Sequence, residues 1–174
     1  KKLILLSLIL CLATTIKASN NVVIVWAGSG SMAESMGDES KMTVSKKALQ
    51  AVLAKLAPDS KVGIVLFSSY SDGWVYPLGP VDKTKILEEI EKASAGGGTP
   101  LGAYMKVGAD SLLALRDKEK YGNYRLLVVT DGEANDSNLV EAYLPDILSR
   151  GITVDVIGVN MNADHSLATK VSNY

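Results

Sequence analysis

Short oxygen-bearing side chains gather in three separate stretches of this sequence. Ser29 and Ser31 follow an apolar, β-branched run, Thr99 follows three glycines, and Asp131 follows a second apolar run. Hydroxyl and carboxylate oxygens are the ligands of hard divalent cations, and Mg²⁺ takes six oxygens at about 2.0–2.1 Å, several of them usually from water. A fold that brings the three stretches together would therefore offer a site for Mg²⁺, or for Mn²⁺ or Ca²⁺.

The elements that must position these stretches alternate between two periodicities. Apolar, β-branched runs predict buried strands, and apolar residues at helical spacing predict helices between them. We predict strands at residues 22–26, 62–67, 74–76, 126–130 and 152–159, and helices at 44–56, 83–90, 100–113 and 139–148. The alternation is typical of an α/β fold with a doubly wound, mostly parallel sheet. Only a short turn precedes the third strand, which must therefore pair antiparallel with the second.

Two helix starts carry capping residues. Asp82 can cap the helix that follows it, and Thr99 at N-cap with Pro100 at N1 predicts the start of the next one. In open α/β sheets, ligands bind beyond the carboxyl ends of the strands, where the strand order reverses. All three oxygen-bearing stretches follow a strand or precede a helix, so we expect them to converge at that edge.

Taken together, the stretches resemble the von Willebrand factor type A family. The resemblance is carried by VVIVWAGSGSM at residues 22–32, GGGTPLG at 96–102 and VVTDGEAND at 128–136. The first corresponds to the DxSxS segment of the family's metal-ion-dependent adhesion site. The likeness covers essentially all of residues 19–174 and implies a sheet of order 3-2-1-4-5 with helices on both faces. The family usually adds a sixth strand and a closing helix, which we expect this C-terminally truncated domain to lack.

The resemblance also implies roles for the site residues. Ser29 and Ser31 would bind a divalent ion directly, Thr99 directly or through water, and Asp131 mostly through water. Ala27 departs from the family, because the aspartate of DxSxS is missing there. That aspartate acts largely through water and by orienting the serines, and outer-shell losses typically weaken metal affinity about 10- to 100-fold. We therefore expect a weakened metal site.

The implied function is non-enzymatic: binding of a protein partner, for adhesion or assembly, through an Asp or Glu of the partner that completes the ion's coordination. Ala27 keeps open the alternative of a metal-independent structural or assembly module. Glu133 and Asp136 are near enough in sequence to replace the missing carboxylate, although a solvated turn and a helix cap are their more ordinary roles. Tyr70, Trp74 and Tyr76 pack at the sheet edge or form a protein-contact patch.

Two enzymatic or nucleotide-binding interpretations find little support in the residues. Gly28, Gly30 and Ala33 match a dinucleotide fingerprint, but Ser68 and its neighbour stand where an acidic residue should follow the second strand. An esterase would need a GxSxG elbow, and the glycines and serines alternate in the wrong phase. The single histidine, His165, stands in the terminal segment.

Residues 1–18 have the pattern of a secretory signal peptide. Two lysines precede a short apolar run, and Ala18 offers a cleavage site before Ser19. The run falls short of the roughly 20 apolar residues needed to span a bilayer, so we expect membrane association only if this segment stays uncleaved. The only cysteine, Cys11, would leave with it. Export without cysteines favours a bacterial periplasm, cell surface or secreted location.

Loss of residues 1–18 removes three lysines, so 15 basic residues would face 19 acidic ones and the formal charge would be −4. No basic stripe for phosphate binding remains, which argues against a nucleic-acid partner. The remaining chain is long enough for one domain with its own core.

Overall fold

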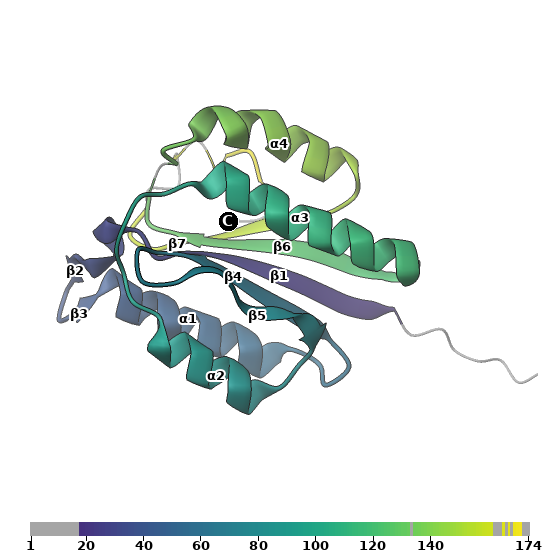
Figure 1. The fold of residues 1–174 in the computed structure, drawn as a ribbon, viewed down its shortest axis with the longest axis horizontal. Helices are drawn as coiled ribbons and strands as arrows, with labels where there is room; N and C mark the ends of the chain where they lie inside the picture. The colour runs from purple at the N-terminus through teal and green to yellow at the C-terminus, as the bar shows by residue number, and fades with distance from the viewer. Residues whose placement is uncertain (1–17, 133, 162–164, 166, 168, 172–174) are drawn as a thin grey trace, which may run out of the picture.

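The computed structural model describes residues 18–132, 134–161, 165, 167 and 169–171. In this part of the chain, a central sheet lies between two layers of helices (Figure 1). One face is covered by α3 and α4 and the other by α1 and α2. The helices are α1 (Lys41–Lys55), α2 (Lys83–Lys92), α3 (Leu101–Lys118) and α4 (Ser137–Ser149). The predicted doubly wound α/β fold is confirmed, and no described helix is long and apolar enough to cross a membrane.

The main sheet has the order β5-β4-β1-β6-β7. Its strands are β1 (Ser19–Ala27), β4 (Lys61–Phe67), β5 (Asp72–Pro80), β6 (Gly122–Thr130) and β7 (Thr153–Gly158). All neighbours are parallel except β4 and β5. This confirms the predicted order 3-2-1-4-5 with its antiparallel third strand. The lack of a sixth strand stays a prediction, because several C-terminal residues lie outside the described part of the chain.

Strand β5 is longer than the predicted 74–76. It pairs with β4 from Asp72 to Pro80, with irregular register near Ile64. Most of its side chains are exposed or half-buried, because it lies at the sheet edge. An edge strand lacks the continuous apolar pattern of a buried one, so its ends were not visible in the sequence.

A small hairpin precedes α1 and was not predicted. After the 3-10 turn Gly30–Ala33, β2 (Ser35–Met36) pairs antiparallel with β3 (Glu39–Ser40). Gly37 has a φ of 69°, a left-handed conformation that glycine adopts without a steric penalty. The amide of Lys41 then donates to the carbonyl of Glu34 at 2.9 Å. The hairpin thus returns the chain to the sheet edge where α1 begins.

The core lies on both faces of β1. Val25 and Ala27 belong to the apolar cluster beneath α3 and α4, whereas Ile24 and Trp26 belong to the cluster beneath α1 and α2. The Trp26 indole donates to the hydroxyl of Ser45 in α1 at 3.0 Å. The alternation follows from the two-residue period of a strand. It places the side chain of Ala27 on the α3 side of the sheet.

Helix α3 starts one residue later than predicted. Its N-cap is Pro100, which has no side chain to accept a hydrogen bond, so the prediction of Thr99 at N-cap was wrong. The carboxylate of Asp136 instead accepts from the amides of Gly102 and Ala103, at 3.0 and 2.9 Å. A carboxylate from another segment therefore satisfies the first turn of α3. By contrast, Asp82 caps α2 as predicted, accepting from the amide of Lys85 at 3.1 Å.

Candidate functional site at the carboxyl edge of the sheet

The glycine-rich loop before α3 is bonded through its backbone to the loop after β1. The amide of Gly96 donates to the carbonyl of Gly28 at 2.6 Å, and the amide of Gly30 donates to the carbonyl of Gly97 at 2.9 Å. Gly97 has a φ of 87°. These two hydrogen bonds join residues that are 67 and 68 positions apart in the sequence, and they hold the two loops in one arrangement.

The loop after β6 joins them through Thr99. The Thr99 amide donates to Oδ1 of Asn135 at 2.5 Å, and the Asn135 amide donates to the Thr99 carbonyl at 2.9 Å. Thr99 is buried. Between described residues, no hydrogen bond joins its hydroxyl to Ser29, Ser31 or Asp131. Thr99 therefore lies in the joined loops, and the hydrogen bonds described for it are made by its backbone amide and carbonyl.

The other three predicted site residues form one hydrogen-bonded group. Ser31 Oγ donates to Asp131 Oδ1 at 3.0 Å and lies 3.1 Å from Ser29 Oγ. Ser29 Oγ is also 3.5 Å from Asp131 Oδ1, which is a long contact for a hydrogen bond between oxygens. The Asp131 side chain is only 2% exposed. The fold thus brings together residues that are 100 or more positions apart in the sequence.

A lysine that the sequence analysis missed completes the group. Lys41 Nζ lies 3.0 Å from Asp131 Oδ2 and 2.7 Å from Glu34 Oε2, and the lysine side chain is 10% exposed. Hydrogen bonds from the ammonium to Glu34, and next to Asp131, raise the pKa of Lys41 above its usual value. The group therefore contains a permanent positive charge at neutral pH.

The sequence did contain one signal for this lysine. Lys41 is the first residue of α1, and Ser40 is its N-cap, with Oγ accepting from the Thr43 amide at 3.1 Å. A cation at a helix N-terminus is disfavoured by the helix dipole. A buried lysine at this position therefore needs nearby carboxylates, which Asp131 and Glu34 supply.

These residues do not fit the divalent ion that the family resemblance implies. Ala27 contributes no oxygen, and its side chain is fully buried in the apolar cluster. The only carboxylate of the predicted set, Asp131, already holds the Lys41 ammonium on Oδ2.

One of the two acids named as possible replacements for the aspartate has another role in the described structure. Both carboxylate oxygens of Asp136 accept hydrogen bonds from the first turn of α3. Asp136 therefore caps α3, although it directly precedes α4 in the sequence. Glu133 lies outside the described residues.

The three aromatic residues near the antiparallel edge have different environments. Tyr76 is buried, and its hydroxyl donates to the Pro80 carbonyl at 2.7 Å. Trp74 is partly exposed and packs close to Gly63. Tyr70 is 76% exposed, and its ring lies against Gly96, where an added Cβ would meet Cε2 at 2.8 Å. Only Tyr70 of the three thus presents most of its surface to solvent, beside the joined loops.

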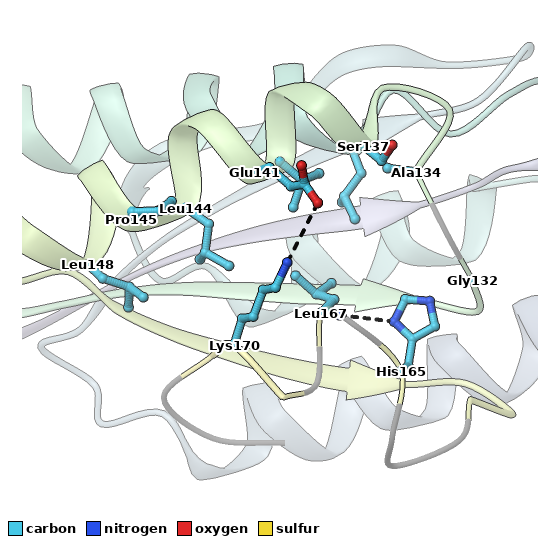
Figure 2. A pocket seen from close by; sticks show the side chains of 12 residues that line it. Gly132, Ala134, Ser137, Glu141, Leu144, Pro145, Leu148, His165, Leu167 and Lys170 are labelled. Atoms are coloured by element: carbon cyan, nitrogen blue, oxygen red, sulfur yellow. Dashed lines mark hydrogen bonds and ion pairs between the residues drawn. The ribbon is translucent and has the colours of Figure 1, made fainter.

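Away from this hydrogen-bonded group, a largely apolar pocket lies between α4 and residues that follow β7 (Figure 2). Leu144 and Leu148 of α4 face Leu167 across it, and the Lys170 ammonium lies 3.7 Å from the Glu141 carboxylate at its rim. His165 also lines it, and its Nδ1 accepts from the Leu167 amide at 3.2 Å.

Solved structures with this architecture include metal-bound domains. The manganese-loaded TRAP protein of Plasmodium vivax superposes with a TM-score of 0.66 and 20% identity over 83% of this chain and 59% of its own. Proximal thread matrix protein 1 of the mussel byssus, with a zinc-occupied MIDAS motif, superposes with a TM-score of 0.69 and 17% identity over 90% of this chain and 44% of its own. This chain therefore spans about half the length of these two proteins.

Two further relatives are covered over most of their length. The SpRpn10 VWA domain superposes with a TM-score of 0.65 and 14% identity, over 88% of this chain and 82% of that domain. YwmD of Bacillus subtilis (strain 168), described as uncharacterized, is 23% identical over 161 residues, which are 84% of this chain and 70% of YwmD. The model of the von Willebrand factor type A domain matches residues 21–173. The chain belongs to the von Willebrand factor type A domain family.

Proposed function

We propose that this chain is a non-enzymatic protein-binding domain, of the adhesion or assembly kind, whose contact surface is the loop face. The loop face consists of residues 28–31, 68–72, 96–99 and 131–135, without residue 133. Domains of this family are typically protein-binding or adhesion modules. The observation that carries the proposal is an exposed aromatic ring, Tyr70, beside loops that are bonded to one another.

Backbone hydrogen bonds make the loop face suitable for recognition. The Ser69 amide donates to the Gly96 carbonyl at 2.9 Å, which adds the Tyr70 loop to the bonded set. Loops that are already ordered lose little conformational entropy when a partner binds. Tyrosine combines a large apolar surface with a hydroxyl and is enriched among residues that dominate binding energy. We therefore expect Tyr70 to anchor the contact.

Two modes of binding are available, and we propose that this domain uses the metal-independent one. In the first mode, an Asp or Glu of the partner completes the coordination of a weakly held Mg²⁺, Mn²⁺ or Ca²⁺. In the second, protein atoms alone form the contact. Ala27 removes one metal-orienting carboxylate, and the Lys41 ammonium lies on the other, Asp131. Both features favour the second mode.

Site-specific photo-cross-linking tests the proposal. A photo-reactive phenylalanine replaces Tyr70 in cells that make the native protein, and the same residue replaces Tyr121 as the matched control. Tyr121 is 69% exposed and lies just before β6, at the opposite edge of the sheet. We expect a discrete protein adduct from position 70 and none from position 121. Equal yields at both positions, or an adduct only at 121, would refute the loop face as the contact.

We further propose that the domain acts outside the cytoplasm, with residues 1–18 as the export signal. The basic start, the short apolar run and Ala18 support this. Neither a nucleic acid nor a nucleotide is a proposed ligand, because the residues lack a basic stripe and an acid after the second strand.

A further inference from the structure

We propose that Lys41 is the built-in cation of the loop face: its ammonium group balances Asp131 in place of a divalent ion, so the site is complete without metal and rejects it. The proposal concerns the same face as the proposed function and rests on it for its biological meaning. Its test uses the isolated chain and no partner.

The burial of the pair is the first support. The side chain of Asp131 is 2% exposed and that of Lys41 is 10% exposed, so both have little contact with solvent. A buried carboxylate without a counter-charge is strongly unfavourable, which is why buried charges are paired or bound to metal. The 3.0 Å contact between Lys41 Nζ and Asp131 Oδ2 supplies that counter-charge. Glu34 is 66% exposed and keeps its hydration, so the buried charge is close to neutral.

The second support is that both oxygens of Asp131 are engaged. Ser31 donates to Oδ1, and Lys41 donates to Oδ2. The hydroxyl of Ser29 is 3.1 Å from that of Ser31, so the two serines interact with each other as well as with the carboxylate. A divalent ion could bind here only by expelling the ammonium or by lying close to it. In either case like charges repel each other in a site with little water.

The third support is that Ala27 and Lys41 compensate each other in charge. Ala27 ends a strand that pairs with β6 as far as Trp26 and Val129, so an aspartate there would add a second carboxylate at this edge of the sheet, and a single ammonium could not balance both. With Ala27, one buried carboxylate faces one buried ammonium. Ala27 and the Lys41 ammonium are therefore consistent with each other in charge, and replacing both should create a metal site.

The experiment compares metal responses of five proteins: the native chain, K41M, K41R, the double variant A27D/K41M and the control K47M. Methionine keeps the length of the lysine chain without its charge. Lys47 is on the same helix and pairs with Glu39 at 2.6 Å, but its side chain is 62% exposed. Thermal unfolding with EDTA, or with millimolar Mg²⁺ or Mn²⁺, gives the midpoint shift. Titration of Mn²⁺ followed by electron paramagnetic resonance gives the affinity.

We expect no metal-induced shift of the unfolding midpoint in the native chain, K41R or K47M. K41M should gain a shift, because Asp131 then lacks a counter-charge and a metal ion bound to the folded state stabilises it. A27D/K41M should bind Mn²⁺ about 10- to 100-fold more tightly than K41M, since it restores the orienting carboxylate. A native chain that binds Mn²⁺ as tightly as A27D/K41M would overturn the proposal.

A further variant keeps the test decisive if K41M does not fold. A27D alone retains Lys41, and we expect it to stay insensitive to Mg²⁺ and Mn²⁺. Tight Mn²⁺ binding by A27D would show that the ammonium does not reject metal and would overturn the proposal. Absence of cross-linking at Tyr70, with the expected metal responses intact, would instead count against the proposed function alone.

Discussion

Lys41 Nζ lies 3.0 Å from Asp131 Oδ2, although the two residues are 90 positions apart in the sequence. The pair joins the first residue of α1 to the loop that follows β6. It therefore ties the helix layer on one face of the sheet to the edge where the loops meet. The Lys41 ammonium also contacts Glu34, and we expect the two carboxylates to contribute very differently to the free energy of unfolding.

We expect Asp131→Asn to lower the free energy of unfolding by about 3 kcal/mol, because it breaks a buried ion pair and leaves a largely buried ammonium with one exposed partner. Urea denaturation at neutral pH measures this. The double variant Asp131→Asn with Lys41→Met removes both charges and should recover part of the loss. Additive losses in the double variant would contradict direct coupling of the two side chains.

Glu34→Gln should have a much smaller effect, although Glu34 Oε2 is the nearer oxygen at 2.7 Å. Its side chain is 66% exposed, and exposed ion pairs contribute about 1 kcal/mol or less. The same urea experiment should show a loss that shrinks further at high salt. A loss as large as that of Asp131→Asn would mean that Glu34 carries the charge balance.

Gly102→Ala should destabilise the domain by about 1–3 kcal/mol, because the added Cβ would lie 2.6 Å from the Val140 amide nitrogen, where α3 approaches α4. Alanine is intrinsically better than glycine in a helix by about 1 kcal/mol, so a loss would show that the close approach outweighs this preference. Gly132→Ala is the control, since its Cβ meets nothing within 4 Å. Urea denaturation of the two variants and the native chain measures the loss. A midpoint of unfolding for Gly102→Ala above that of the native chain would contradict the packing argument.

We expect Tyr124 to contribute to the loss of stability at alkaline pH. Burial, followed by the charge of Glu119, raises the pKa of Tyr124 above its ordinary 10.0, so its neutral form is favoured in the folded state. The resulting stability is fully present below pH 10.0 and is lost as pH rises through the folded-state pKa. The free energy of unfolding should therefore fall more steeply above pH 10.0 in the native chain than in Tyr124→Phe. Parallel curves would exclude this contribution.

If residues 1–18 are an export signal, their removal defines the N-terminus of the mature chain. When the chain is made with its own leading residues in an exporting bacterial host, mass spectrometry of the exported protein should find a chain that begins at or near Ser19. Recovery of the protein with residues 1–18 still attached, in the membrane fraction, would indicate an anchor in place of a cleaved signal.

The sequence alone determined the order of the sheet and the identity of the loops. Buried parallel strands such as 22–26 and 126–130 are continuous apolar runs, and a helix between two strands forces a parallel crossover, so local patterns predicted the elements and their parallel pairing. The order of the strands came from the family resemblance. The likeness of three short segments to one family then indicated which loops meet at the carboxyl edge. Ser29, Ser31 and Asp131 could be named for the same reason.

Only the tertiary structure decided what these side chains contact. Lys41 reaches Asp131 because an unpredicted hairpin returns the chain to the sheet edge, and Asp136 caps α3 because α4 starts beside it. A long side chain at a helix start has no periodic signal, and its partner is set by packing between elements distant in sequence. The sequence therefore indicated where the site lies, and the contact between the first residue of α1 and the loop after β6 decided which cation Asp131 meets.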